Sequence, residues 1–519
     1  MSLLFAVLLV LVSRASSKNV VQFNVTKGLP GIHVGSAPSL ARRGTHAEQL
    51  INNISGGGYY VSVKVGTPGQ KLTMLLDTGS SDAWVLGHEA DLCTDQDLQH
   101  LYGMPCTDTY DPSKSASNKL VKANGFRITY LDGGTASGDY ITEDFAIGGI
   151  TVKSLQMAYV TKAVRGTGIL GLGFSISERA STKYPNIIDE MSDQGLISSK
   201  AYSLYLNDRR TDSGSLLFGG IDTDKFIGPL SILPMYKPPG GYYSSFEVNF
   251  TAVSFTYANG TEHTIPTSIL DHPAPAVLDS GSTLSYLPDE MTQPIHAALG
   301  TTYSPDLRMT LIDCAHLHTP SPTGTALSHL TFTFSPTTTI TVPLRELILD
   351  ILPPSYSTEK KGSRACVFGI QSTALFSSAS DDDDDDDQPS SNFTLLGDTF
   401  LRSAYVVYDL THYQIGLAQA NLNSTTSTVV ELSSSSPGTE TTGLPRLTGV
   451  SAQQTTFTPT STAGANGGPN GGGAGTDPER NAAAGGGAGL GGRMPVREVV
   501  AVAVVTGVFT LLGGALVAF

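Results

Sequence analysis

Two copies of one short motif constrain this chain more than any other feature. Asp77-Thr78-Gly79-Ser80 is repeated as Asp279-Ser280-Gly281-Ser282, and each Asp directly follows apolar residues typical of a buried strand. A third Asp-Ser-Gly begins at Asp212, but Arg210-Thr211 precede it, which favours an ordinary turn there. Any single copy would also fit a turn, so the surroundings of the repeat decide its meaning.

Each of the two copies is followed by an apolar element that ends in glycine. Ile169-Leu170-Gly171 lies downstream of the first motif, and Leu395-Leu396-Gly397 lies downstream of the second. The separations between Asp and Gly are 94 residues (77 to 171) and 118 residues (279 to 397), and most of the excess falls in a Ser- and Asp-rich insertion at about 372–392. The chain therefore predicts two related lobes, each of which donates one Asp.

Short strand-like runs fill the region around these motifs. Runs rich in β-branched and aromatic residues, bounded by Gly and Pro, are found at 59–66, 71–77, 126–132, 202–206, 215–220, 330–335 and 403–410. Helical patterns are few, and the best are 186–195 and 288–299. This distribution predicts an all-β fold.

Charge and cysteine content exclude several classes of function. The formal net charge is −15 and no basic face is evident, which argues against nucleic-acid binding. Charged residues make up 15% of the chain, and the abundance of Ser, Thr and Gly favours a secreted β-rich protein. The four cysteines lack C-x-x-C or His-rich spacing, so we expect two disulfides, no metal site and no cofactor.

The N-terminus has the pattern of a secretory leader. Residues 3–12 are apolar and small residues follow, which predicts a signal peptide at 1–17, with a buried strand as the alternative. Residues 18–43 are short of core-forming pattern and end in Arg42-Arg43, which resembles a processing site for a proprotein convertase. We interpret 18–43 as the propeptide of a zymogen.

The C-terminus has the pattern of a membrane anchor. Residues 422–480 are rich in Ser, Thr, Gly and Pro and lack apolar periodicity, which predicts a flexible stalk. A cluster of small residues, a polar spacer and the uncharged run 499–519 then follow, which is the order of a GPI-anchor signal at 481–519. The alternative is an ordinary tail-anchored helix, since the run is long enough to span a bilayer.

The motifs resemble those of the pepsin-like aspartic proteases, family A1, over about 57–421. The two Asp motifs, the two apolar-apolar-Gly elements and "FGGID" at 218–222 occur in the order of that family. The resemblance implies a bilobal fold, with an N-terminal lobe at 44–228, a C-terminal lobe at 229–421 and the active site in the cleft between them. Together with the predicted terminal segments, the chain is similar to the yapsin-type, GPI-anchored fungal members, which act at the cell surface.

The resemblance implies that Asp77 and Asp279 are catalytic. Two carboxyl groups held close together share one proton in acid, which allows peptide hydrolysis by an activated water without a metal or a covalent intermediate. In the family, the residues next to each Asp hold the carboxylates in position. By this resemblance the supporting residues are Thr78, Gly79, Ser80, Ser280, Gly281 and Ser282.

The resemblance also implies a β-hairpin flap with Tyr130 as the flap tyrosine and Gly133 in its turn. Trp84, the only Trp of the chain, matches the family Trp that hydrogen-bonds this tyrosine. Asp132 follows near the expected S1 pocket, where a carboxylate would accept a Lys or Arg side chain, so we expect tolerance of or preference for basic P1 residues. The alternative for Asp132 is a solvated Asp at a hairpin tip.

Further expectations concern the surface of the protein. By resemblance the disulfides pair Cys93 with Cys106 and Cys314 with Cys366. The acidic run Asp381–Asp387 is interpreted as a solvated loop, with long-range attraction of basic substrates as the alternative. The expected glycosylation sites are Asn53, Asn249, Asn259, Asn392 and Asn423.

The function predicted from these patterns is an extracellular, monomeric aspartic endopeptidase that acts on proteins or peptides at acidic pH. It would be attached to the plasma membrane or cell wall through its anchor. Two alternatives stay open at this point. One is a non-catalytic binding protein on the same fold, and the other is a structural or adhesive cell-wall protein whose stalk matters most.

Overall fold

The computed structural model describes the greater part of the expected folded region. The described residues are 20–27, 58–102, 105–131, 133–211, 213–270, 275–317, 326–352, 356–357, 363–377, 393–432 and 443–451. Several predictions fall outside them: the signal peptide 1–17, Arg42-Arg43, the acidic run, the stalk from 452 onward, and the anchor signal 481–519. Among the described residues, no helix is both long and apolar enough to cross a membrane.

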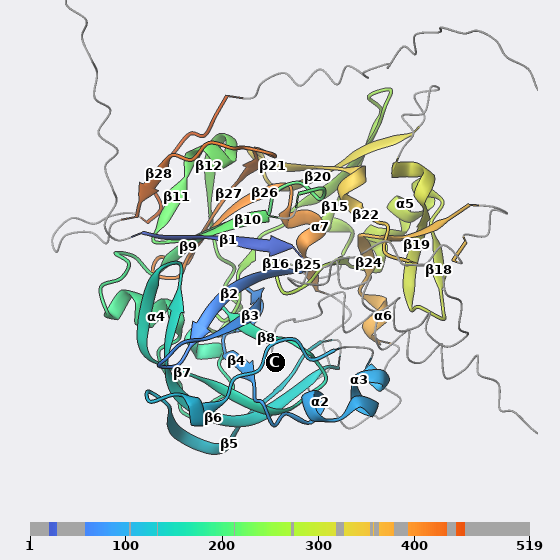
Figure 1. Ribbon diagram of the computed structural model, residues 1–519. Coiled ribbons are helices and arrows are strands. Elements are labelled where there is room, and N and C mark those ends of the chain that lie inside the picture. The colour runs from blue at the N-terminus through green and yellow to red at the C-terminus, as the bar shows by residue number, and fades with distance from the viewer. Residues whose placement is uncertain are drawn as a thin grey trace, which may run out of the picture.

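The chain is mostly β-structure, as predicted from the short runs. Within the described residues the largest sheet has 13 strands, and its order is β12-β27-β26-β9-β10-β1-β2-β3-β8-β4-β7-β6-β5 (Figure 1). Its strands are β1 (Val21–Lys27), β2 (Tyr59–Val65), β3 (Gln70–Asp77), β4 (Ala83–Leu86), β5 (Lys119–Thr129), β6 (Thr135–Ile147), β7 (Ile150–Ala163), β8 (Gly168–Gly171), β9 (Ala201–Tyr205), β10 (Ser213–Phe218), β12 (Phe226–Pro234), β26 (Ala404–Asp409) and β27 (Gln414–Ala420).

Four smaller sheets complete the β-structure of the described residues. The second Asp motif lies in the five-stranded sheet, whose order is β13-β16-β25-β17-β24. The strands of these sheets are β11 (Gly220–Asp222), β13 (Glu247–Val248), β14 (Ala252–Tyr257), β15 (Glu262–Pro266), β16 (Ala276–Leu278), β17 (Ser285–Leu287), β18 (Thr302–Ser304), β19 (Met309–Asp313), β20 (Leu327–Ser335), β21 (Thr338–Pro343), β22 (Ile348–Leu349), β23 (Ala365–Phe368), β24 (Ile370–Ser372), β25 (Thr394–Leu396) and β28 (Val429–Glu431).

Helices are short; α2, α3 and α5 lie at the periphery, whereas α7 lies near the centre of the molecule (Figure 1). Both expected helices are present, as α4 and α5, and the Asn186 side chain caps the start of α4. The α-helices are α2 (Asp91–Thr94), α3 (Gln96–Tyr102), α4 (Ile187–Asp193), α5 (Asp289–Leu299), α6 (Ala374–Ser377) and α7 (Asp398–Leu401). The 3-10 helices are η1 (Pro112–Lys114), η2 (Ser175–Ser177), η3 (Thr223–Lys225), η4 (Thr267–Ile269), η5 (Cys314–Leu317) and η6 (Leu344–Leu347).

The two lobes share strands, which the sequence boundary at residue 228 does not anticipate. β9 and β10 belong to the predicted N-terminal half, yet β9 pairs antiparallel with β26 of the C-terminal half, with Tyr205 opposite Tyr405. β12 pairs in the same way with β27. The lobes are therefore joined by a common sheet. Strands at and before the predicted boundary pair with β26 and β27, the strands near the end of the C-terminal lobe.

The expectation that residues 18–43 lack a core-forming pattern is wrong for β1. This strand lies between β10 and β2 in the large sheet, with Val25 opposite Gly214 and Thr26 opposite Tyr60. Val21 and Val25 are buried, as expected for positions on one face of a strand. The expected propeptide therefore supplies a strand in the middle of the fold, next to the strands that lead to Asp77 (Figure 1).

The predicted start of the stalk at residue 422 is too early. β28 pairs antiparallel with β11, and bridges join Thr448 and Val450 to β12. Leu432 and Leu444 are buried against the C-terminal strands, although the region is rich in Ser and Thr. A few apolar residues with free sheet edges nearby are enough to hold a polar segment in place, so the fold extends to about residue 451.

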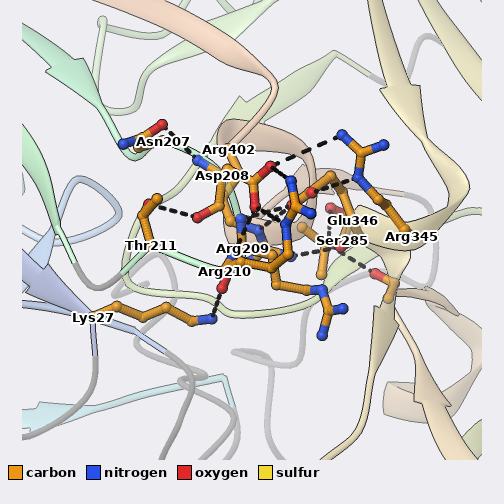
Figure 2. Close-up of polar contacts among 12 residues, drawn as sticks. Lys27, Asn207, Asp208, Arg209, Arg210, Thr211, Ser285, Arg345, Glu346 and Arg402 are labelled. Atoms are coloured by element: carbon orange, nitrogen blue, oxygen red, sulfur yellow. Dashed lines mark hydrogen bonds and ion pairs between the residues drawn. The ribbon is translucent and has the colours of Figure 1, made fainter. Parts of the chain in front are cut away.

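A buried polar cluster lies where β1 meets the C-terminal lobe (Figure 2). Arg402 and Glu346 are each 1% exposed, and Arg402 Nε donates to Glu346 Oε2 at 3.1 Å. Lys27 Nζ donates to the Arg209 carbonyl at 2.8 Å, and the Arg209 N–H donates to Glu346 Oε2 at 3.2 Å. The Arg402–Glu346 pair is buried, and the contacts of this cluster connect β1, the β9–β10 loop and η6.

Candidate active site

Asp77 is the last residue of β3 and is fully buried. β3 pairs in parallel with β8, so that Asp77 lies opposite Gly171. The Leu172 N–H donates to the Asp77 carbonyl at 2.8 Å, which fixes the backbone where the strand ends. The first Asp motif and the first apolar-apolar-Gly element, far apart in sequence, are therefore adjacent in the fold.

Asp279 has the equivalent position in the C-terminal lobe. It follows β16 directly, is fully buried, and its N–H donates to the Leu396 carbonyl of β25 at 3.1 Å. β16 and β25 are parallel, with Leu278 opposite Leu396. The second Asp motif and the second apolar-apolar-Gly element are thus adjacent through parallel strands, as the first two are. The repeat in the sequence corresponds to a repeat in the structure.

Both glycines of the apolar-apolar-Gly elements are required by close packing of the backbone. A Cβ at Gly171 would lie 2.6 Å from the carbonyl carbon of Ser81, and one at Gly397 would lie 2.3 Å from the Leu284 carbonyl oxygen. Any larger residue would push the paired segments apart. The glycines therefore let each Asp loop and its neighbouring strand approach closely.

Thr78 and Ser280 cross-link the two Asp loops. Thr78 Oγ1 donates to the Leu278 carbonyl at 2.9 Å, and Ser280 Oγ donates to the Leu76 carbonyl at 3.0 Å. Each hydroxyl also accepts from the other residue's backbone N–H, at 2.9 Å for Thr78 Oγ1 and 3.2 Å for Ser280 Oγ. The two lobes are therefore tied together directly beneath the carboxyl groups.

Each carboxyl group accepts the same pair of hydrogen bonds from its own loop. The Gly79 N–H donates to Asp77 Oδ1 at 2.8 Å, and the Ser80 hydroxyl donates to Asp77 Oδ2. In the other lobe, the Gly281 N–H donates to Asp279 Oδ1 at 2.8 Å, and the Ser282 hydroxyl donates to Asp279 Oδ2 at 2.7 Å.

The two carboxyl groups are close enough to influence each other. A Cβ at Gly79 would lie 2.6 Å from Asp279 Oδ1, so the Asp279 carboxyl lies against the opposite loop. Burial raises the pKa of Asp77, and the bonds from Ser80 and Gly79 oppose this effect. Burial, and then the charge of Asp77, raise the pKa of Asp279 well above its usual range. This environment favours one proton shared between the two groups.

The flap is a hairpin formed by β5 and β6. Thr129 pairs with Thr135, and the Tyr130 N–H donates to the Gly134 carbonyl at 2.8 Å. Gly133 has φ of 79°, which suits Gly in a tight turn. The strand ends at Thr129, so the run 126–132 expected from the sequence is only partly a strand. Leu131 packs against an apolar cluster of the C-terminal lobe, so the hairpin reaches across to that lobe.

Trp84 and Tyr130 form the hydrogen bond that the resemblance implies. Trp84 lies in β4 and is fully buried, and its Nε1–H donates to Tyr130 Oη at 2.7 Å. Tyr130 itself is only 3% exposed. Asp132 lies outside the described residues, so its predicted contact with a basic side chain stays a prediction.

The remaining predicted positions are placed as follows. Both disulfides are present, Cys93–Cys106 and Cys314–Cys366. Cys314, Asp350 and Cys366 are the only cluster of possible metal ligands in the described part of the chain, but both cysteines are in that disulfide. Among the expected glycosylation sites, Asn249, Asn259 and Asn423 are exposed, while Asn53 and Asn392 lie outside the described residues.

One residue beside the site was not anticipated from the sequence. Arg165 is 5% exposed and its guanidinium carbon lies 5.0 Å from the centre of the Tyr130 ring. The signal was present, since Arg165 is the only charged residue between Ala163 and Phe174, in the loop just before β8. A single Arg in a loop is usually exposed, which is why the sequence alone gave it no role.

These features, two lobes with paired strands and two buried, hydrogen-bonded aspartates, define an aspartic protease. The family model of the eukaryotic aspartyl proteases matches residues 58–420, and the chain belongs to this family of pepsin-like aspartic-type endopeptidases. It is 38% identical to the probable aspartic-type endopeptidase opsB of Aspergillus fumigatus over 381 residues, which cover 72% of this chain and 71% of the relative.

Two further relatives extend the comparison to yeasts. The acid protease of Saccharomycopsis fibuligera is 37% identical over 70% of this chain and 80% of its own length. Secreted aspartic protease 8 of Candida albicans is 31% identical over 74% of this chain and 81% of its own length. The similarity covers the described lobes rather than one motif, as expected for a shared fold and reaction.

Proposed function

We propose that Asp77 and Asp279 are the catalytic dyad of this endopeptidase. The observation that carries the proposal is the matched environment of the two buried carboxyl groups, each of which accepts one backbone N–H and one Ser hydroxyl from its own loop. These bonds leave the carboxyls held in fixed orientations at the point where the lobes meet. Charged groups that are already held in position can stabilise a transition state without first having to reorient.

The proposed reaction is hydrolysis of a peptide bond by a water molecule. The ionised member of the dyad takes a proton from the water, whose oxygen attacks the peptide carbonyl carbon, and the protonated member donates to the carbonyl oxygen. The C–N bond of the resulting tetrahedral intermediate then breaks, and the leaving nitrogen takes the proton that the first carboxyl gained from water. A hydroxyl of the intermediate returns a proton to the second carboxylate as the carboxylic acid product forms. Because both carboxyl pKa values are raised by burial, we expect the singly protonated dyad to persist through mildly acidic pH.

The experiment that tests this proposal uses the secreted full chain. Peptide cleavage is measured from about pH 3 to about pH 6, with and without pepstatin, an inhibitor of aspartic proteases. Cleavage that pepstatin abolishes is the expected result. Tight substrate binding without cleavage would favour the alternative of a non-catalytic binding protein, and neither binding nor cleavage would favour a structural wall protein.

The proposed setting is the outer cell surface, reached through the secretory pathway. This proposal is supported by the sequence of the two ends, with an apolar leader at 3–12 and the uncharged run 499–519. The similarity to secreted aspartic protease 8 of Candida albicans also supports it. Treatment of intact cells with a phospholipase that cuts phosphatidylinositol anchors should release the activity. A matched chain that stops at residue 480 should appear in the medium without treatment.

The proposed specificity includes basic P1 residues, through Asp132, which is two residues after Tyr130 in the sequence. A carboxylate there would form a charge-assisted contact with a Lys or Arg side chain. Profiling cleavage of a peptide library by the wild type and by Asp132→Ala tests this. Loss of basic P1 sites in the variant supports the contact, and an unchanged profile contradicts it.

A further inference from the structure

Arg165 is a buried arginine beside the flap tyrosine, Tyr130. It belongs to the loop between β7 and β8, and β8 is the strand whose last residue, Gly171, lies opposite Asp77. Its side chain is almost completely buried, with 5% exposed. Buried arginines usually have a definite interaction, and Arg165 has one with the ring of Tyr130.

The guanidinium of Arg165 faces the ring of the flap tyrosine. The distance from its central carbon to the ring centre of Tyr130 is 5.0 Å, which lies within the range of a cation–π interaction. The hydroxyl of the same ring accepts the hydrogen bond from Trp84 Nε1 at 2.7 Å. Tyr130 is therefore held at its ring by Arg165 and at its oxygen by Trp84, from two different elements.

The backbone next to Arg165 is fixed by a segment that a disulfide holds in place. The Gly166 carbonyl accepts from both the N–H and the hydroxyl of Thr107, each at 2.9 Å. A Cβ at Gly166 would lie 2.0 Å from the Pro105 carbonyl oxygen, so the two segments are in close contact. Cys106, between these residues, is bonded to Cys93. The guanidinium is thus presented from a well-supported loop.

The charge of Arg165 also acts on the dyad. The positive charge lowers the pKa values of both Asp77 and Tyr130, whereas burial, the larger effect, raises them. Burial raises the pKa values of Tyr130, Tyr202 and Tyr408, so these rings are neutral in acid. The charges of the dyad also raise the pKa values of these three buried tyrosines. In the described residues, Arg165 is the cation among the principal influences on the pKa of Asp77.

We propose that Arg165 is a positioning residue for catalysis, which holds the flap tyrosine against Trp84 and stabilises the negative charge of the dyad. The role rests on the proposed dyad chemistry, but it concerns a residue outside both Asp motifs. It predicts a pH effect of definite sign. Without the positive charge, the first proton is lost from the dyad at higher pH, and the second proton is also held more strongly.

The experiment compares variants of the secreted full chain. Arg165→Met removes the charge, Arg165→Gln is a second neutral variant in case Met prevents folding, and Arg165→Lys keeps the charge without the planar group. kcat and KM are measured from about pH 3 to about pH 7. For the neutral variants we expect both limbs of the kcat/KM profile to move to higher pH by about half a unit, and kcat to fall about tenfold. The Lys variant should keep the wild-type profile.

Tryptophan fluorescence gives a readout that does not depend on activity. Trp84 is the only Trp of the chain, and its indole nitrogen contacts Tyr130 directly, so its emission reports on the flap tyrosine. The neutral variants should change this emission. Lys225 offers a matched control, because it is also buried and lies 5.5 Å from the ring centre of Tyr205, away from both Asp motifs. Lys225→Met should leave both the emission and the pH profile unchanged.

The outcomes separate the inference from the proposed function. An active wild type with neutral Arg165 variants that keep its pH profile and emission would overturn the inference alone. Equal shifts in the Lys and Met variants would also overturn it, because a purely steric role would then account for the effect. A wild type without pepstatin-sensitive cleavage would overturn both the dyad chemistry and the role of Arg165.

Discussion

Thr78 and Ser280 bind each other's loops in a nearly symmetric way. Each hydroxyl donates to a carbonyl of the opposite lobe, at 2.9 Å from Thr78 to Leu278 and at 3.0 Å from Ser280 to Leu76. All four groups are buried, so water cannot replace a lost partner easily. The relative position of the Asp77 and Asp279 carboxyl groups therefore depends on these two side chains.

This relationship predicts the effect of removing one hydroxyl. Thr78→Val keeps the shape of the side chain but removes the hydroxyl that the Ser280 N–H donates to, and it leaves the Leu278 carbonyl with only the longer bond from Tyr408 Oη at 3.4 Å. We expect a loss of about 1–3 kcal/mol in the free energy of unfolding and a fall in kcat of at least about tenfold. Thr78→Ser, which keeps the hydroxyl, should stay close to the wild type. Denaturant unfolding and peptide cleavage measure both effects, and a Val variant equal to the wild type would contradict this account.

The glycines behind the aspartates give a second prediction. Gly171→Ala or Gly397→Ala would place a methyl group 2.6 Å or 2.3 Å from backbone atoms of the facing segments. Backbone cannot move aside as a side chain can, so we expect destabilisation of more than about 3 kcal/mol, or no secreted protein. Gly125→Ala is the control, since a methyl there would meet only the flexible Lys122 side chain. Equal secretion of all three variants would count against the proposed packing.

Buried carboxyl groups outside the dyad predict how stability depends on pH. Glu178 is 1% exposed, and burial raises its pKa to about 9. A raised pKa in the folded state means that the folded protein binds the proton more tightly than the unfolded chain. The contribution of Glu178 to the free energy of unfolding is therefore fully present below about pH 4.5. It is lost between about pH 4.5 and pH 9, at roughly 1.4 kcal/mol per pH unit.

Glu178→Gln tests this dependence directly. The amide cannot ionise, so the free energy of unfolding should fall less steeply from acid to alkaline pH than in the wild type. Some slope should persist, because burial also raises the pKa of Asp398 to about 8. Glu290→Gln, on the exposed surface of α5, is the matched control and should not alter the slope. Parallel curves for the wild type and Glu178→Gln would show that this carboxyl does not contribute.

The two disulfides should differ in their contribution to stability. Cys93–Cys106 joins residues 13 apart, and Cys314–Cys366 joins residues 52 apart. In the chain-entropy model the longer loop gives more stabilisation, about 4 kcal/mol against about 3 kcal/mol. Replacing both cysteines of each pair by Ser, and comparing the midpoints of thermal unfolding, checks the order. A larger effect from the shorter loop would mean that strain or packing outweighs loop entropy.

The sequence predicted the parts of the site that depend on local patterns. The Asp motifs and their apolar-apolar-Gly partners were recognisable because each is a short run with a fixed requirement, a strand end or a close backbone approach. The Trp84–Tyr130 contact followed from the same resemblance. Both expected helices, 186–195 and 288–299, also agree closely with α4 and α5, because their apolar periodicity is local.

The parts that the sequence did not predict depend on distant partners. β1 has a suitable alternation, but only its pairing with β10 and β2 shows that it lies inside the sheet. Likewise, 422–451 looked like stalk because its composition is polar, and its place is set by the free edges of β11 and β12. Arg402 and Glu346 form a buried pair, although charged residues are usually exposed and no local pattern joins residues so far apart in the sequence.

The central claim is that Asp77 and Asp279 act together, and three Asp-to-Asn variants test it most directly. Asp77→Asn and Asp279→Asn keep the size of the side chain but remove the shared proton. Asp212→Asn alters the third Asp-Ser-Gly, whose Ser213 and Gly214 begin β10. We measure kcat/KM for one peptide at acidic pH. The prediction is a loss of at least about a thousandfold for each dyad variant, with the activity of Asp212→Asn unchanged. Substantial cleavage by either dyad variant would contradict it.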